Sequence, residues 1–125
     1  MTKKVLSLGQ CGVDHYVLRH FLDSEFGAAT VPVDTFVQAL AELRKEKYDL
    51  VLVNRILDAN GAEGLDFVAD IKKDSALAGV PVMLVSNHKR AQETAVARGA
   101  LPGFGKAELD TPHTIERLKP LLASE

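Results

Sequence analysis

Short runs of consecutive apolar residues alternate along the chain with longer segments in which apolar residues recur every three or four positions. The two clearest runs are residues 50–53 and 80–85. Runs of this kind, without alternation of apolar and polar positions, are typical of strands buried on both faces in a parallel sheet. The segments with a period near 3.6 residues predict amphipathic helices, so the pattern indicates strands and helices in alternation.

The pattern predicts five strands and five helices, with turn and cap residues setting several of their ends. Gly27 is expected to stop the first helix, and Asp34 or Thr35 to cap the second. Thr111 is expected to cap the last helix, which then has a proline at its first position. The predicted strands are 5–8, 28–33, 50–54, 80–85 and 101–105. The predicted helices are 13–26, 36–47, 65–71, 89–98 and 112–122.

Three prolines limit the position or length of the predicted strands and helices. Pro32 removes a backbone donor from the second strand, which places that strand at or near an edge of the sheet. Pro102, followed by Gly103, makes the last strand the weakest of the five predictions. Pro120 is expected to kink or shorten the last helix.

A strand followed by a helix, repeated five times, predicts an α/β fold with a parallel sheet and helices on both faces. The length of 125 residues suits one domain, residues 1–125, with a five-stranded sheet. We therefore expect a flavodoxin-like, doubly wound (βα)5 sandwich with strand order 2-1-3-4-5. In such sheets the functional site lies outside the carboxyl ends of the strands.

Polar residues follow four of the predicted strands at that edge. Gly9 and Gln10 follow the first strand, Asn54 the third, Ser86 the fourth and Lys106 the fifth. A central polar residue, a hydroxyl and a lysine in this order form a candidate pocket.

These residues and the motifs around them resemble the receiver domain of bacterial response regulators over essentially the whole chain. The motifs are 48–54 (YDLVLVN), 64–67 (GLDF), 80–86 (VPVMLVS) and 98–100 (RGA) leading to Lys106. The resemblance implies a phosphoryl transfer from a histidine kinase to an aspartate at the position of Asn54. It also implies two acidic residues after the first strand that hold Mg²⁺, and a Ser/Thr and a Lys that bind the phosphoryl oxygens.

Several of these positions differ from the family. Asn54 carries a neutral amide, which cannot form an acyl phosphate. Gly9 and Gln10 stand where the acidic pair belongs, and Mg²⁺ prefers hard anionic oxygens. Ser86 and Lys106 alone are retained. We therefore predict a degenerate pseudo-receiver with no phosphorylation, no metal and no cofactor.

Three further departures fall outside the pocket. The aromatic residue that changes position in the family is replaced by Gly103, and Phe104 next to it is expected to point to the other face. The proline that follows the lysine in the family is Ala107. The loop from Asn54 to Gly64 is about two residues longer than usual, judged from an ungapped comparison of its motif.

The retained and altered pocket residues each allow more than one role. Asn54 either locks the domain in one signalling state or simply caps nearby backbone. Lys106 either binds an anion, pairs with Asp14 or Asp58, or reaches solvent, while Ser86 is expected to act mainly as a hydrogen-bonded hydroxyl at the strand end. Cys11 is expected to be a small turn residue, with a redox role as the alternative.

We predict a non-enzymatic domain that acts through a protein partner in a signalling pathway, with a second copy of the chain as one candidate. The family's partner face corresponds to the fourth helix, fifth strand and fifth helix. Its candidate contact residues are Ala91, Ala95, Arg98, Phe104 and Ile115. The alternative function is an anion or small-molecule sensor that uses Ser86 and Lys106, with Arg55 as a further donor. An enzyme is disfavoured because residues 9–12 (GQCG) lack a G-x-G-x-x-G pattern and a P-loop lysine.

Composition adds limits on the partner and the compartment. A net charge of -2 and a pI near 6.1 give no electrostatic reason to expect nucleic acid or a membrane surface. A single cysteine cannot form an internal disulfide, so a cytoplasmic location is expected.

Overall fold

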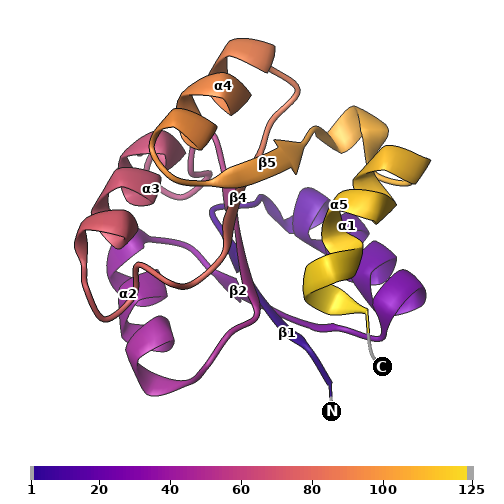
Figure 1. The fold of residues 1–125 in the computed structure, drawn as a ribbon, viewed down its shortest axis with the longest axis horizontal. Coiled ribbons are helices and arrows are strands. Elements are labelled where there is room, and N and C mark those ends of the chain that lie inside the picture. Colours follow the sequence, from indigo (N-terminus) through magenta and orange to yellow (C-terminus); the bar gives the residue numbers. More distant parts are fainter. Residues whose placement is uncertain (1, 124–125) are drawn as a thin grey trace.

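Five parallel strands form one sheet in the order β2-β1-β3-β4-β5, and five α-helices cover its two faces (Figure 1). The structure is a computed structural model and describes residues 2–123. The strands are β1 (Lys4–Leu8), β2 (Ala29–Val33), β3 (Leu50–Asn54), β4 (Val82–Val85) and β5 (Leu101–Phe104). The helices are α1 (Gly12–Phe26), α2 (Phe36–Lys45), α3 (Gly64–Lys73), α4 (Lys89–Ala97) and α5 (Pro112–Leu122), and a 3₁₀ turn, η1, spans Lys106–Glu108. The predicted flavodoxin-like (βα)5 fold is confirmed.

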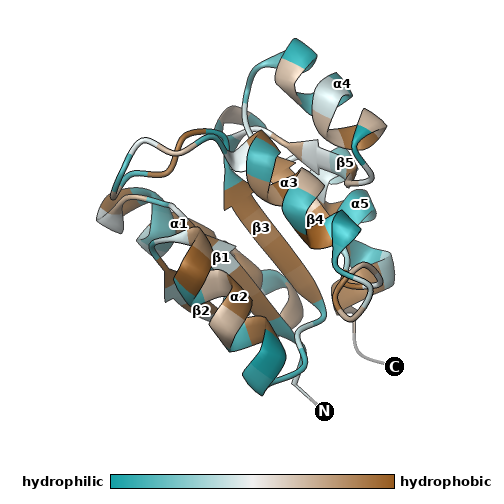
Figure 2. Cartoon of the chain, turned by 90° about the vertical axis from the view of Figure 1, so that its left-hand side faces the viewer, coloured by the Kyte–Doolittle hydropathy of each residue, from teal (hydrophilic) through white to brown (hydrophobic). Residues whose placement is uncertain are grey.

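The central strand β3 divides the core into two layers. Leu50 and Leu52 pack toward α1 and α5, whereas Val51 and Val53 pack toward α2, α3 and α4. All four side chains are fully buried, and β3 is apolar up to its last residue (Figure 2). Each contributes on the order of 1.5–3 kcal/mol of hydrophobic stabilisation. The buried run therefore holds Asn54, its last residue, at the centre of the carboxyl edge.

The turn chemistry determines the predicted element ends. Gly27 adopts a left-handed conformation (φ 64°) and ends α1, and Thr35, not Asp34, caps α2 by accepting a hydrogen bond from the Gln38 N–H. The prediction that Pro32 places its strand at an edge is confirmed, since β2 is the outermost strand.

Helix α5 reaches Leu122, the predicted end, and continues past Pro120. Of the two effects expected of this proline, the shortening is wrong and the kink stays a prediction. Leu118 and Leu122 are fully buried against the sheet on either side of Pro120. Their packing holds the last turn despite the missing backbone donor.

Strand β5 pairs irregularly with β4. Met83 lies opposite Leu101 and Val85 opposite Phe104, so one residue of β4 faces two residues of β5. This bulge sets which face each β5 side chain occupies and leaves local backbone groups without ladder partners.

Among the described residues, no helix has the length and apolar character needed to cross a membrane.

Candidate functional site

The strand ends bring the predicted pocket residues to one edge of the sheet but not into one cavity, and Gly9 lines neither of the two cavities found there. Asn54, Ser86 and Lys106 line a cavity of about 220 Å³ together with Arg55 and His88. Gln10 lies away from this cavity and lines a neighbouring one of about 180 Å³, to which Lys106 also contributes.

Asn54 uses its amide entirely on neighbouring backbone. Its Nδ2 donates to the carbonyl oxygens of Ile56 (2.8 Å) and Gly9 (3.2 Å), and its Oδ1 accepts from the Arg55 N–H (3.1 Å). The side chain therefore ties the end of β1 to the loop that follows β3, as the backbone-capping alternative expects. A carboxylate has no hydrogen to donate to these two carbonyl groups.

Gly9 has a backbone conformation and surroundings that require glycine. Its φ is +80°, and a Cβ placed on it would lie 2.5 Å from Cγ of Leu57. An acidic side chain at this position would strain the backbone and displace a fully buried leucine. Gly9, which the resemblance aligns with a metal-binding acid, therefore lies where only a residue without a side chain fits.

Lys106 is engaged by a carboxylate from the first turn of α1. Its Nζ lies 2.5 Å from Oδ2 of Asp14, as one of the predicted alternatives has it. The hydrogen bond from Lys106 lowers the pKa of the Asp14 carboxyl below its ordinary value. Because both side chains are more than a third exposed, the pair contributes at most about 1 kcal/mol to stability.

Ser86 shapes the chain as it leaves β4. Its Oγ accepts a hydrogen bond from the His88 N–H (3.1 Å), and the residue is buried. This is the expected role of a strand-end hydroxyl.

No charged oxygen cluster accompanies these groups in the described part of the chain. Within residues 2–123, no group of three or more His, Cys, Asp or Glu side chains is placed to hold a metal ion. Cys11 caps α1, its Sγ accepting a weak hydrogen bond from the Asp14 N–H (3.5 Å).

Several solved structures of response regulators have the same architecture. A Chloroflexus aurantiacus protein named provisionally as a response regulator is 16% identical, with a TM-score of 0.84 over 99% of this chain and 100% of that chain. The signal receiver domain of a DNA-binding response regulator from Colwellia psychrerythraea is 24% identical, with a TM-score of 0.79 over 95% and 97% of the two chains. HP1043, an orphan response regulator of H. pylori, is 20% identical, with a TM-score of 0.71 over 96% of each chain.

The chain has the receiver-domain fold. No family model matches the sequence, and no curated protein matches it. At these sequence identities the structural similarity establishes the fold alone. The chemistry of the site is therefore inferred from the side chains of this chain.

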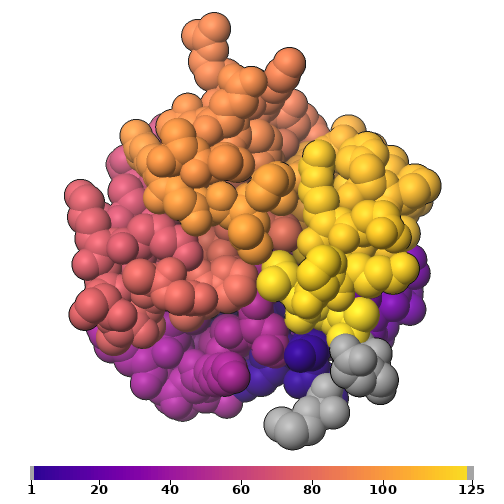
Figure 3. Space-filling view, in the orientation of Figure 1, coloured from indigo at the N-terminus to yellow at the C-terminus, as the bar shows by residue number. Residues whose placement is uncertain are grey.

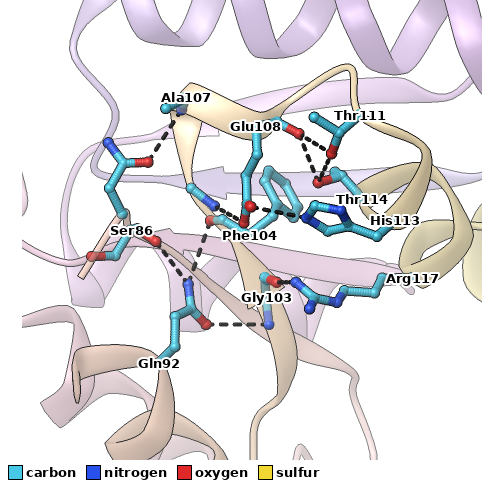
Figure 4. A network of polar contacts seen from close by, with 12 residues as sticks. Ser86, Gln92, Gly103, Phe104, Ala107, Glu108, Thr111, His113, Thr114 and Arg117 are labelled. Atoms are coloured by element: carbon cyan, nitrogen blue, oxygen red, sulfur yellow. Dashed lines mark hydrogen bonds and ion pairs between the residues drawn. The ribbon is translucent and has the colours of Figure 1, made fainter. Parts of the chain in front are cut away.

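Gln92 is the site residue that sequence reasoning missed. This α4 side chain reaches over the β4–β5 bulge, where its Nε2 donates to the carbonyl oxygens of Leu84 (2.8 Å) and Ser86 (3.1 Å), and more weakly to that of Phe104 (3.4 Å). Its Oε1 accepts from the Gly103 N–H (3.2 Å) (Figure 4). One side chain thus satisfies backbone groups from both strands. The available signal was its position three residues before the fully buried Ala95, which places it on the inner side of α4.

Gly103 is held between two helices and has no room for a side chain. A Cβ at this residue would lie 2.1 Å from the carbonyl oxygen of Leu84 and 2.9 Å from Oε1 of Gln92. Its own carbonyl oxygen accepts a hydrogen bond from Arg117 on α5. The N–H and the carbonyl group of Gly103 are thus bonded to side chains of α4 and α5, respectively.

Glu108 organises the segment between β5 and α5 (Figure 4). Its carboxylate accepts from the Gly105 N–H (3.1 Å) and contacts His113 Nε2 (2.9 Å), and the hydrogen bond with His113 is the main cause of its lowered pKa. Its carbonyl oxygen accepts from the Thr111 and Thr114 hydroxyls. Thr111 therefore stands at the predicted N-cap, but its hydroxyl bonds to the preceding turn instead of capping α5.

The predicted partner face needs correction at two residues. Phe104 and Ala95 are fully buried and cannot contact a partner. The bulge turns Phe104 into the layer between the sheet and α1 and α5, and Ala95 packs on the opposite face of the sheet. Ala91 and Ile115 are half-buried, and the exposed Arg98 lies 3.5 Å from Asp66 on α3.

The accessible feature on this side is a groove of about 720 Å³ between α4, β5 and α5, which lie side by side in Figure 3. Its lining includes the apolar Val96 and Pro102 and charged residues of both signs. The lining residues are Ser86, Asn87, Lys89, Gln92, Glu93, Val96, Pro102, Gly103, Ala107, Glu108 and Arg117.

Proposed function

We propose that this chain is a receiver-like signalling domain that has lost phosphorylation and acts by binding a protein partner. The observation that carries the proposal is the state of Asn54. The resemblance assigns it to the phosphoacceptor position, and its amide is hydrogen-bonded to backbone through both its nitrogen and its oxygen. An amide in this arrangement offers no nucleophilic oxygen that could form an acyl phosphate.

The surroundings of Asn54 support the same proposal. Gly9 leaves no space for a metal-binding acid, and Gln10 supplies a neutral amide in place of the second one. Mg²⁺ binding in proteins depends on carboxylate oxygens, which both positions lack. Restoring the aspartate alone would therefore leave the metal site incomplete.

The contacts of Gln92 and Gly103 favour a domain that keeps one conformation. A phosphorylation switch needs two arrangements of comparable free energy. Here α4, β4, β5 and α5 are joined through buried backbone groups that would lose their partners if β5 moved.

The groove between α4, β5 and α5 is the surface we assign to the partner. Its lining combines apolar residues with charges of both signs, the composition of a specific protein contact, in which charge selects the partner. Strand addition to β5 is disfavoured, because Pro102 has no N–H and Arg117 occupies the Gly103 carbonyl. Side chains of the partner would therefore make the contact.

Two experiments test this function. Incubation with acetyl phosphate and Mg²⁺ is expected to leave the intact mass unchanged. Affinity capture from the source organism, followed by a binding measurement with the purified partner, is expected to be weakened by Val96→Glu in the groove. Val37→Glu is the matched control, since Val37 is exposed on α2, outside the groove. Equal loss of binding in both variants would contradict the assignment of the surface.

The anion-sensor alternative has less support. Lys106 is already paired with Asp14, and the Ser86 hydroxyl already accepts from the His88 N–H. If the alternative is correct, phosphate or sulfate raises the melting temperature and Lys106→Ala cancels the rise.

A further inference from the structure

The solvent-facing side of α1 carries an apolar patch. Val13, Tyr16 and Val17 lie three and four residues apart and are 74%, 68% and 48% exposed. Residues at this spacing share one side of a helix, so the three side chains are neighbours on the surface. A cluster of exposed apolar side chains on one helix favours a contact with another molecule.

Charged residues extend this patch along α1. Arg19 and Asp23 are exposed and line one shallow depression of the surface together with Tyr16 and His20. Asp23, Arg19 and Tyr16 form a row along the helix, spaced by four and then three residues. The order of the row is acid, base, aromatic, from the carboxyl end of α1 toward its start. Within residues 2–123, no ion pair joins Arg19 or Asp23 to another residue.

A complementary row lies on α4, along the groove between α4, β5 and α5. Lys89, Glu93 and Val96 are exposed, line the groove and are also spaced by four and then three residues. The order of this row is base, acid, apolar. In the described part of the chain, neither Lys89 nor Glu93 has an ion-pair partner.

The apolar end of the α4 row suits an aromatic ring. Val96 is 43% exposed and lies one turn after Gln92, whose side chain bonds to Gly103. Pro102 precedes Gly103, and Arg117 donates to the Gly103 carbonyl oxygen (Figure 4). A guanidinium plane stacks on an aromatic face, and valine and proline supply apolar surface beside it. Val96, Pro102 and Arg117 therefore surround a position for one aromatic side chain.

We propose that α1 of one copy of the chain binds in this groove of a second copy, with α1 and α4 antiparallel. Each residue of the α1 row then meets its complement, because the two rows have the same spacing and opposite charges. The pairs are Asp23 with Lys89, Arg19 with Glu93, and Tyr16 with Val96. A second copy is thus a specific partner for the groove, and this assignment rests on the function proposed above.

Sedimentation velocity of the unmodified chain over a range of concentrations tests self-association. The sedimentation coefficient is expected to rise with concentration. Tyr16→Ala and Val96→Glu are each expected to weaken association at least about tenfold, because each removes a central apolar contact. Val37→Glu is the control and is expected to leave association unchanged, since Val37 is an exposed residue of α2 outside both surfaces.

Mixing the two weakened variants locates the contact. The Tyr16→Ala variant keeps its groove, and the Val96→Glu variant keeps its α1 row. An equimolar mixture is therefore expected to form a one-to-one complex under conditions in which neither variant associates alone.

A charge exchange tests the pairing of the two rows. Arg19→Glu and Glu93→Arg are each expected to weaken association, because each places like charges opposite each other. The double variant is expected to associate again, since it keeps the pair with its charges exchanged.

An unmodified chain that stays monomeric up to its solubility limit would overturn the proposal. A mixture that forms no complex, or a double variant no better than the single variants, would do the same. These results differ from a failure of the proposed function. If the chain is monomeric but a purified partner loses binding in Val96→Glu, only the second copy is excluded. If Val96→Glu weakens neither contact, the groove is not the partner surface.

Discussion

Replacing Gln92 with leucine tests whether this side chain holds α4 to the irregular edge of the sheet. The substitution keeps a similar volume but removes three hydrogen bonds of ordinary length, to Leu84 O, Ser86 O and Gly103 N. Each such bond contributes about 0.5–1.5 kcal/mol, and a buried backbone group left without a partner costs about 1–3 kcal/mol. Water reaches part of the site through the groove, so the expected loss of unfolding free energy is about 2–4 kcal/mol.

Urea denaturation followed by circular dichroism measures this loss as a lower midpoint with an unchanged slope. Hydrogen exchange of the Gly103 amide is expected to accelerate in the same variant, because this N–H loses its acceptor. Gln38→Leu is the control for loss of an exposed glutamine: it removes one hydrogen bond, from the Asp34 N–H, with an expected change of at most about 1 kcal/mol. A Gln92→Leu variant with unchanged stability and unchanged Gly103 exchange would refute the proposed role of this residue.

Three further predictions concern the pocket. Gly9→Asp is expected to destabilise the fold by at least about 2 kcal/mol, because the backbone of Gly9 is left-handed and Leu57 occupies the space of the new side chain. Gly12→Asp is the control and is expected to be tolerated, because nothing lies within 4 Å of a Cβ at Gly12. Equal denaturation midpoints for the two variants would contradict the steric argument. The Asn54→Asp variant is expected to remain unphosphorylated by acetyl phosphate and Mg²⁺, since positions 9 and 10 carry no acidic residue. An added phosphoryl group in the intact mass of this variant would show that reasoning to be wrong. The pairing with Lys106 depresses the pKa of Asp14, so its stabilisation is complete above the ordinary value of 3.8 and is lost as the pH falls through the depressed pKa. The difference in unfolding free energy between the unmodified chain and Lys106→Ala is therefore expected to shrink as the pH is lowered below 3.8, and a difference that grows there would contradict the pairing.

The sequence predicted the fold because its strongest signals come from burial on both faces of the sheet. The apolar run within 50–54 indicated the central strand, because a strand buried on both faces is continuously apolar. Pro32 indicated an edge strand, because proline has no N–H to donate to a neighbouring strand. The same reasoning placed Asn54, Ser86 and Lys106 at one cavity, because parallel strands end at a common edge.

The β5 edge could not be predicted in the same way. Phe104 was expected at a partner face, but the bulge opposite Leu84 makes it a core residue, and a shift of one residue exchanges the two faces of a strand. Gln92 was missed because a glutamine in an amphipathic helix is normally solvent-exposed. Its role depends on the unpaired backbone groups of the bulge, which exist only in the folded sheet.

The positions that differ from the family also make specific contacts with neighbouring residues. Asn54 bonds to carbonyl groups that a carboxylate would repel, Gly9 lies against Leu57, and Gly103 lies against Leu84. Reversing any one of them would disturb packing as well as restore chemistry. These contacts support the proposal that the domain acts without phosphorylation.

The most direct test of the proposed function is the intact mass of the purified chain after incubation with acetyl phosphate and Mg²⁺. We predict an unchanged mass, because Asn54 has no nucleophilic oxygen and neither Gly9 nor Gln10 has a carboxylate to hold the metal. Addition of one phosphoryl group per chain, lost in Asn54→Ala, would contradict the central claim.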